Sequence, residues 1–322
     1  MAEPFGATST TDDVLSGMNL SGKRVLVTGV SAGLGVEIAR ALVAHGAQVV
    51  GTAREISKAE RATGGILAQA TNGGGLALMQ MDLASLDSVR ACSAALVAEG
   101  RPFDAVIANA GVMWTPFGRT TEGFETQFGT NHLGHFAFVN WIASLIAPGG
   151  RLVVVASTGH RGSDVDLEDP NFERTPYDAR LAYARSKTAN ILFAVEFDRR
   201  HRARGVRATA VHPGVIKTEL DRHMTLGEMD SVVQQINAMS TASGHPPFRY
   251  KSVPQGAATP VWAALVADAE RVGGRYCEDC QASPVIEQAV SPMSHGVMPY
   301  AMDSQHAQAL WVRSEEMIGE RF

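Results

Sequence analysis

Short apolar runs alternate with helix-like segments along most of this 322-residue chain, and that alternation restricts the fold more than any other feature. Apolar runs of strand length lie at 24–28, 48–52, 76–80, 104–108, 151–156 and 206–211, with a shorter seventh at 273–277. Helical patterns fill the windows 34–45, 55–70, 85–99, 121–147, 181–204 and 255–269. Continuous apolar strands separated by helices are typical of a parallel sheet covered on both faces. The sequence therefore predicts a single doubly wound α/β domain with a mostly parallel seven-stranded sheet, whose ligands bind at the carboxyl ends of the strands.

The main domain is expected to cover residues 22–280, because no change in composition divides the chain. Residues 1–21 are polar, with a short helical pattern at 11–18, and indicate an N-terminal lead-in. Residues 281–322 are interpreted as a C-terminal extension packed on the domain.

Two segments interrupt the alternation of strands and helices. Residues 159–180 form an acidic, loop-like insertion between a strand and the helix that follows it. Residues 217–253 carry Met224, Met229, Val232 and other apolar side chains at helical or loose spacing. An insertion at the carboxyl end of a strand forms either a lid over the substrate or a helix that covers the core, and both interpretations stay open for 217–253.

The composition argues against several classes of protein. A net charge of −5 without a dominant lysine or arginine block argues against nucleic acid as a partner. No apolar stretch reaches the roughly 20 residues of a membrane span, and the N-terminus lacks the pattern of a secretory signal. Three cysteines exclude a disulfide scaffold, and the single pair Cys277 and Cys280 supplies too few ligands for a zinc site, so no metal is expected. A cytoplasmic protein is the expectation, and a homo-oligomer is compatible with the sequence.

The stretch TGVSAGLG, Thr28–Gly35, places three glycines directly after the first predicted strand and before a helical pattern. Glycine loses more conformational freedom on folding than other residues, so such a cluster needs a steric reason. One reason is a tight turn with a ligand resting on bare backbone, and the other is an ordinary corner of the chain. A helix that begins there offers free N–H groups and a partial positive charge to a phosphate. Within an α/β alternation, the stretch indicates a dinucleotide site.

Tyr183 and Lys187 lie four residues apart in a predicted helix, so their side chains share one face. The ordinary pKa of tyrosine, about 10, makes it a poor proton donor or acceptor at neutral pH. A neighbouring ammonium group favours the phenolate and lowers that pKa. Ser157 ends another apolar strand, where its hydroxyl would donate a hydrogen bond to an oxyanion beside Tyr183. The sequence NAG at 109–111 follows a third buried strand, where small residues let a cofactor lie flat.

Taken together, these motifs resemble the short-chain dehydrogenase/reductase family over residues 20–280. In chain order they read TGVSAGLG at 28–35, DL at 82–83, NAGV at 109–112, NHLGHF at 131–136, Ser157, YARSK at 183–187 and HPGVIKT at 212–218. The NHLGHF block, the long gap before Tyr183 and the stretch GGRYCEDC are most similar to the retinol-dehydrogenase-like branch. The resemblance implies a Rossmann-type fold and an oxidoreductase that uses a nicotinamide cofactor.

The resemblance also implies roles for particular side chains. Tyr183 would be the general acid and base, and Lys187 would lower its pKa and bind the nicotinamide ribose. Ser157 would orient and polarise the substrate carbonyl, and Asn131 would hold a water that connects the lysine to solvent. The gap between Ser157 and Tyr183 is longer than the family's usual spacing, so Thr158 stays open as an alternative to Ser157.

The cofactor-binding residues that the resemblance implies follow the carboxyl ends of the predicted strands. Asp82 would meet the adenine, and Ile216 and Thr218 would hold the carboxamide. The full set comprises Gly29, Ser31, Gly33, Leu34, Gly35, Arg54, Asp82, Leu83, Asn109, Ala110, Gly111, Tyr183, Lys187, Pro213, Gly214, Ile216 and Thr218.

The end of the second predicted strand decides which cofactor is expected. An NAD enzyme of this fold usually places an acidic residue there for the ribose hydroxyls. This chain has Ala53 followed by Arg54, whose guanidinium would meet a 2′-phosphate with two hydrogen bonds. A solvent-facing arginine is the alternative. NADP(H) is therefore preferred over NAD(H).

The expected function is the interconversion of a ketone or aldehyde and an alcohol on a hydrophobic small molecule. The hydride would come from the nicotinamide and the proton from Tyr183. Two other functions stay open: NADPH-dependent reduction of an activated C=C bond, and a catalytically silent NADP-binding regulatory protein. The intact set of Asn131, Ser157, Tyr183 and Lys187 argues against the silent protein.

Overall fold

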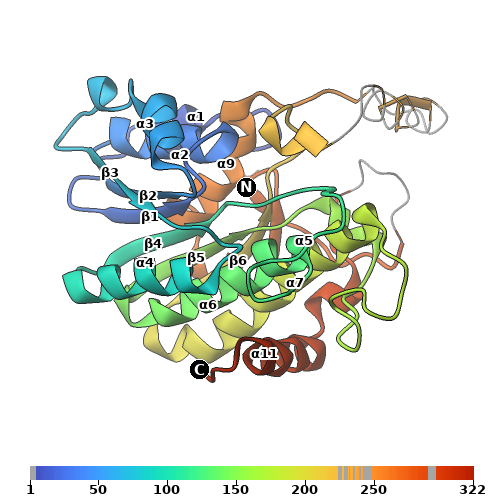
Figure 1. Ribbon diagram of the computed structural model, residues 1–322. Helices are drawn as coiled ribbons and strands as arrows, with labels where there is room; N and C mark the ends of the chain where they lie inside the picture. Colours follow the sequence, from blue (N-terminus) through green and yellow to red (C-terminus); the bar gives the residue numbers. More distant parts are fainter. Residues whose placement is uncertain are drawn as a thin grey trace.

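A single sheet of eight strands runs through the middle of the computed structural model (Figure 1). The structure describes residues 5–223, 227, 231, 233–234, 236–238, 241, 248–288 and 295–322. The strands are β1 Arg24–Thr28, β2 Gln48–Ala53, β3 Gly75–Gln80, β4 Phe103–Ala108, β5 Ile146–Val155, β6 Arg207–His212, β7 Tyr276–Glu278 and β8 Gln281–Ala282. Their order is β3-β2-β1-β4-β5-β6-β7-β8. Strands β1 to β7 are parallel, and β8 pairs antiparallel with β7.

The order of the strands reverses between β1 and β4, which pair with each other through Val25 and Ala105, Leu26 and Val106, and Val27 and Ile107. The chain leaves these two neighbouring strands toward opposite sides, so a crevice opens at their carboxyl ends. Thr28 is the last residue of β1 and Gly29 follows it, and Asn109 directly follows β4 at the same crevice. The topology therefore brings the glycine turn and the NAG sequence together.

Helices cover both faces of the sheet (Figure 1). One face carries α1 Thr11–Leu15, α2 Gly33–Ala44, α3 Ile56–Thr63 and α9 Val253–Leu265. The other carries α4 Leu86–Glu99, α6 Gly134–Trp141 and α7 Ala179–His201. The C-terminal helix α11 Ser304–Ile318 packs against the outside of α7. Two further α-helices are short, α5 Thr126–Phe128 and α10 Ala269–Val272.

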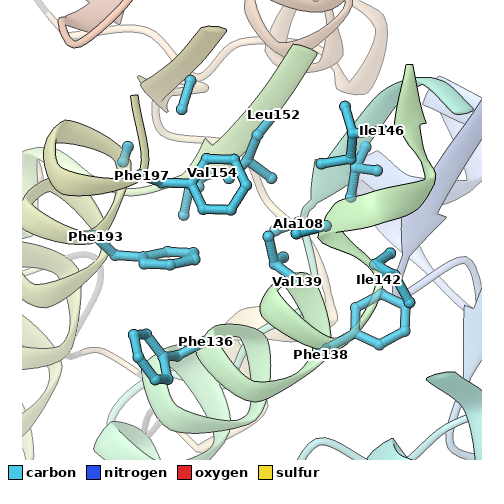
Figure 2. Packing of buried hydrophobic residues seen from close by; sticks show 14 of the residues in the cluster. Ala108, Phe136, Phe138, Val139, Ile142, Ile146, Leu152, Val154, Phe193 and Phe197 are labelled. Atoms are coloured by element: carbon cyan, nitrogen blue, oxygen red, sulfur yellow. The ribbon is translucent and has the colours of Figure 1, made fainter. Parts of the chain in front are cut away.

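The core between the sheet and the second helical layer is rich in aromatic side chains. Figure 2 shows Phe136 from α6 together with Phe193 and Phe197 from α7 on the side of Val154 of β5, whereas Phe138 of α6 lies beside Ile142. Phe136 and Phe193 meet edge to face, with ring centroids 5.5 Å apart. Such contacts add to the hydrophobic stabilisation from burying the rings, and they fix α7, which carries Tyr183 and Lys187, against α6.

The predicted parallel α/β fold is confirmed, with eight strands instead of seven. The extra strand β8 follows a tight turn at Asp279 and Cys280, whose φ values are +50° and +55°. Turns with two residues at positive φ usually contain glycine or asparagine, and β8 is only two residues long. For these reasons the sequence pattern gave no sign of this hairpin.

The helical window 121–147 also differs from expectation. It contains α5, a π-helical turn at Gly129–Leu133, α6 and a short 3₁₀ turn, rather than one continuous helix. Part of the expected lid, residues 217–253, lies outside the described residues. Within the part of the chain that is described, no helix has the length and apolar character of a membrane span.

Candidate active site

The glycine turn joins β1 to α2 with almost no space around its backbone. A Cβ on Gly35 would lie 2.1 Å from the carbonyl oxygen of Gly29, and one on Gly29 would lie 2.8 Å from the Cβ of Ala110. Gly29 and Gly33 also have positive φ values of +78° and +58°. These glycines are therefore required because the turn packs tightly against the end of β4 and because two of them need left-handed backbone.

The N-terminus of α2 is left without a side-chain cap. Its N-cap residue is Ala32, whose side chain accepts no hydrogen bond. The first N–H groups of a helix have no partner within the helix, and a phosphate is the group that satisfies them best. The bare glycine turn and the uncapped helix fit the pyrophosphate of a dinucleotide.

A cavity of about 340 Å³ extends from this turn across the ends of β2 and β3. Its walls include much of the predicted cofactor set: Gly29, Ser31, Gly33, Leu34, Arg54, Asp82, Leu83, Asn109, Ala110, Gly111 and Thr218. Asn109 is fixed in place because its side-chain amide donates to the carbonyl of Thr28 at 2.8 Å, and its backbone N–H donates to the Thr28 hydroxyl at 2.9 Å. The cavity therefore has a rigid floor made of β1 and β4.

A second, adjacent cavity of about 160 Å³ contains the predicted catalytic side chains. Leu34, Asn109, Gly111 and Thr218 line both cavities, so the two form one continuous site. The second cavity is also lined by Ser157, Thr158, Tyr183, Lys187, Pro213, Gly214 and Ile216. Ser157 lies two residues after the end of β5, whereas Tyr183 and Lys187 project from α7.

The pKa of the Tyr183 phenol is determined mainly by burial. Burial raises the pKa of Tyr183 to about 12, although a hydrogen bond with the Ser157 side chain acts in the opposite direction. Lys187 is also buried, and this lowers its pKa to about 8. Its ammonium donates to the carbonyl of Val155 at 3.1 Å and lies 5.6 Å from the centre of the Tyr183 ring. Without cofactor, Tyr183 is therefore a protonated phenol beside a cation.

Asn131 lies behind the cavity, within the π-helical turn. Its side chain accepts the N–H of Val112 at 2.8 Å and donates to the Val112 carbonyl at 2.9 Å. A Cβ on Gly111 would lie 3.1 Å from the Asn131 amide oxygen and 3.7 Å from the Lys187 ammonium. Asn131 is thus close to the lysine, but it lines neither cavity, and the same is true of Gly35.

Two side chains that the sequence analysis did not select also line the site. Lys58 lies in the first turn of α3, four residues after Arg54, and forms an ion pair with Glu219 at the rim of the larger cavity. Asp221 lines the smaller cavity, and its negative charge contributes to the raised pKa of Tyr183. The place of Lys58 near the start of the helix that follows the second strand was a usable signal, whereas the position of Asp221 depends on how the chain turns after β6.

The cysteines take no part in this site. Cys92, Cys277 and Cys280 are free and buried, and burial raises the pKa of each thiol. A raised pKa leaves little of the reactive thiolate. Within the described residues, no group of three or more histidine, cysteine, aspartate or glutamate side chains could hold a metal ion.

Comparison with known proteins shows the family to which the chain belongs. The model of the short chain dehydrogenase family matches residues 23–228. Retinol dehydrogenase 14 from Mus musculus is 36% identical over 312 residues, which cover 93% of this chain and 87% of that protein. An oxidoreductase from Penicillium decumbens is 37% identical over 323 residues, covering 96% and 92% of the two chains.

Two solved structures share the fold. An uncharacterized protein from Mycobacterium paratuberculosis is similar with a TM-score of 0.71 and 29% identity, over 99% of both chains. A short chain dehydrogenase from Burkholderia cenocepacia, solved in complex with NADP, has a TM-score of 0.62 and 23% identity, over 82% of this chain and 98% of that one.

The doubly wound sheet with a cleft at its switch point, together with the family match and the oxidoreductases among the relatives, indicates a NAD(P)-dependent oxidoreductase. The chain belongs to the short-chain dehydrogenase family and is similar to the retinol dehydrogenases within it.

Proposed function

We propose that this protein reduces a ketone or aldehyde on a hydrophobic small molecule with NADPH, and catalyses the reverse oxidation of the alcohol. The observation that carries the proposal is the convergence of Ser157, Tyr183 and Lys187 on one cavity that continues into the dinucleotide cleft. When bound, the reduced nicotinamide supplies the hydride. The chain's own residues must bind the cofactor, orient the carbonyl and deliver a proton to its oxygen.

Tyr183 is the proton donor in this proposal. Carbonyl reduction needs a group that is protonated before the reaction and can give up its proton as negative charge develops on the substrate oxygen. The buried phenol meets the first requirement, because burial keeps its pKa near 12. For the reverse oxidation the phenolate is needed, and the positive charges of Lys187 and of an oxidised nicotinamide favour it.

Ser157 holds the substrate oxygen beside Tyr183. The Ser157 side chain lies close enough to the Tyr183 phenol to lower its pKa, and this supports Ser157 over Thr158. A donor placed in advance where charge develops stabilises the transition state more than the ground state. Lys187 would bind the nicotinamide ribose, and Asn131, which lies beside Gly111 as Lys187 does, would hold the water that connects the lysine to solvent.

Arg54 and Lys58 support a preference for NADP(H). Both line the larger cavity where the second strand ends, at the place where NAD enzymes of this fold carry an acidic residue. The Arg54 side chain is 67% exposed and pairs only weakly with its neighbour Glu55, at 3.2 Å. An exposed pair of this kind contributes little, so the guanidinium is available for a 2′-phosphate.

Replacement of Arg54 tests this preference. We expect Arg54→Ala to raise the KM for NADPH roughly 10- to 150-fold, because a charge-assisted hydrogen bond contributes about 1.5–3 kcal/mol. The KM for NADH should change little, because NADH has no 2′-phosphate. Steady-state kinetics with both cofactors measures the effect, and Arg61→Ala, on the last turn of α3, is a matched control. Equal losses with NADPH and NADH would contradict the assignment.

The proposed substrate class rests on the walls of the smaller cavity and on the relatives. Leu34, Met113, Val155, Val215 and Ile216 give the cavity apolar walls around its few polar groups. One relative is named retinol dehydrogenase 14, which acts on a bulky apolar alcohol. A screen of NADPH oxidation with all-trans-retinal, a steroid ketone, benzaldehyde and decanal tests the class. Turnover of at least one of these carbonyls supports the proposal, and no oxidation of NADPH with any of them counts against it.

A further inference from the structure

His160 lies directly behind the catalytic cavity and connects it to the C-terminal extension. It belongs to the 3₁₀ turn Thr158–Gly162, three residues after Ser157, and its side chain is fully buried. Its Nδ1 atom is 2.7 Å from the backbone oxygen of Ser157. Its Nε2 atom is 3.2 Å from the backbone nitrogen of Met298. The ring therefore joins the proposed carbonyl-binding serine to Met298, which lies 138 residues after His160 in the chain.

Only one form of the ring satisfies both contacts. The Ser157 carbonyl can only accept a hydrogen bond, so the proton must be on Nδ1. The Met298 N–H can only donate, so Nε2 must carry a free lone pair. The ring is therefore neutral with its proton on Nδ1. Burial lowers the pKa of His160 to about 4, in agreement with this neutral form.

The C-terminal extension fixes this turn at further points. The Tyr300 hydroxyl donates to the His160 carbonyl at 2.7 Å, and Arg161 donates to the Gly296 carbonyl at 2.8 and 3.2 Å. The N–H of Gly296 in turn donates to Glu278 of β7 at 2.6 Å. The extension is thus attached to the turn that follows Ser157 and to the edge of the sheet.

The position of this turn determines where Ser157 lies relative to Tyr183. The Ser157 hydroxyl oxygen accepts the N–H of Gly159 at 3.0 Å. A Cβ on Gly159 would lie only 2.8 Å from the Tyr183 ring, so the turn already contacts that ring closely. A displacement of the turn by a few tenths of an ångström therefore changes the separation of the Ser157 and Tyr183 side chains.

We propose that His160 is a positioning residue. It holds Ser157 in the geometry for carbonyl reduction through the hydrogen bond that its Nδ1–H donates to the backbone carbonyl of Ser157. The C-terminal extension holds the ring in this state through Met298, and it holds the backbone of the same turn through Tyr300. The inference rests on the proposed function, because it assigns His160 to the same reaction. His160 lines neither cavity, so it acts through Ser157 and not on the substrate.

Two substitutions separate the two hydrogen bonds of the ring. The amide nitrogen of His160→Asn reaches the position of Nδ1 and keeps a donor for Ser157, but loses the acceptor for Met298. The amide oxygen of His160→Gln reaches the position of Nε2 and keeps an acceptor for Met298, but loses the donor for Ser157. Both variants lose one bond of the buried ring, so we expect similar decreases in melting temperature.

The two variants are compared in NADPH-dependent reduction of whichever screened carbonyl is turned over fastest. We expect His160→Gln to lower kcat about 10- to 100-fold, the effect of a misplaced catalytic group, with KM nearly unchanged. His160→Asn should stay within about fivefold of the wild-type kcat. NADPH binding, followed by its fluorescence, should stay within about twofold for both variants, because His160 does not line the cofactor cavity.

A double-mutant cycle with Ser157→Ala tests whether His160 acts through the serine. If it does, His160→Gln should lower kcat less than about threefold once Ser157 is already Ala. An equal fold-loss in both backgrounds, or a greater loss of kcat in His160→Asn than in His160→Gln, would overturn the proposal. If both variants fail to fold, Tyr300→Phe is measured in their place. It should lower kcat in the wild-type background and leave kcat unchanged in the Ser157→Ala background.

The cycle also separates failure of this inference from failure of the proposed function. If Ser157→Ala has wild-type kcat, the assignment of the serine is wrong, and the role of His160 is overturned with it. If Ser157→Ala loses turnover but the effect of His160→Gln is additive, the proposed function stands and only the positioning role is overturned.

Discussion

Tyr183→Phe should lower kcat by about 10²- to 10⁴-fold, the usual contribution of a positioned acid or base, and leave NADPH binding nearly intact. The substitution removes only the hydroxyl and keeps the ring that is buried against Lys187 and Gly159. The loss should therefore appear in the chemical step and not in cofactor affinity. Single-turnover oxidation of NADPH with a screened carbonyl measures that step directly.

Tyr177→Phe is the matched control for this substitution. The Tyr177 hydroxyl donates to the Thr115 carbonyl at 2.9 Å and lines neither cavity of the site. We expect a modest loss of stability in Tyr177→Phe with kcat near that of the wild type. Wild-type turnover in Tyr183→Phe would remove this tyrosine from the mechanism, and equal losses in the two variants would show a structural effect.

The free energy of unfolding should fall by several kcal/mol between pH 7 and pH 5. Four histidines, His132, His135, His160 and His212, are buried, and burial lowers their pKa values to about 3 or 4. In the unfolded chain each returns to a pKa of about 6.5. Their contribution to stability is thus complete above pH 6.5 and is lost as the pH falls toward 4. At pH 5 each histidine has lost about 2 kcal/mol.

Two other histidines act in the opposite direction but are more exposed. Hydrogen bonds with Asp279 and Asp164 raise the pKa values of His295 and His306, so these residues stabilise the fold at low pH. The buried set is larger, and the net effect is destabilisation. Because a domain of this kind is stable by only 5–15 kcal/mol, the change is a large part of the total.

Urea unfolding followed by circular dichroism at pH 7, 6 and 5 measures this change. His132→Phe is the informative variant, because its ring would stay among Phe128, Phe136 and Phe193 without a titrating group. It should be less stable at pH 7, because the bond to Ser314 is lost, but should lose less stability between pH 6 and pH 5. A free energy of unfolding that is constant from pH 7 to pH 5 would contradict the account.

The parts of the fold that depend on local pattern could be predicted from the sequence. The expected strand 24–28 coincides with β1, because the apolar run RVLVT is bounded by Lys23 and by the glycine turn. The residues of the site could be predicted from the sequence for the same reason. Its residues follow directly after buried strands, and parallel strands bring their carboxyl ends to one edge of the sheet.

Features that depend on contacts distant in sequence could not be predicted. The π-helical turn around Asn131 leaves no mark on hydrophobic periodicity, because both α-helical and π-helical residues there are buried. The contact of His160 with Met298 joins segments whose separate patterns show no relation. The raised pKa of Tyr183 likewise follows from complete burial in the assembled site, whereas its neighbour Lys187 suggested a lowered pKa.

Deuterium transfer from the cofactor tests the central claim most directly. The wild-type protein is incubated with NADPH that carries deuterium at both C4 positions of the nicotinamide and with each screened carbonyl, and the products are analysed by mass spectrometry. The account predicts one deuterium on the former carbonyl carbon of an alcohol product, formed with NADPH in preference to NADH. Deuterium on a carbon of a reduced C=C bond, or no transfer to any of the carbonyls, would contradict it.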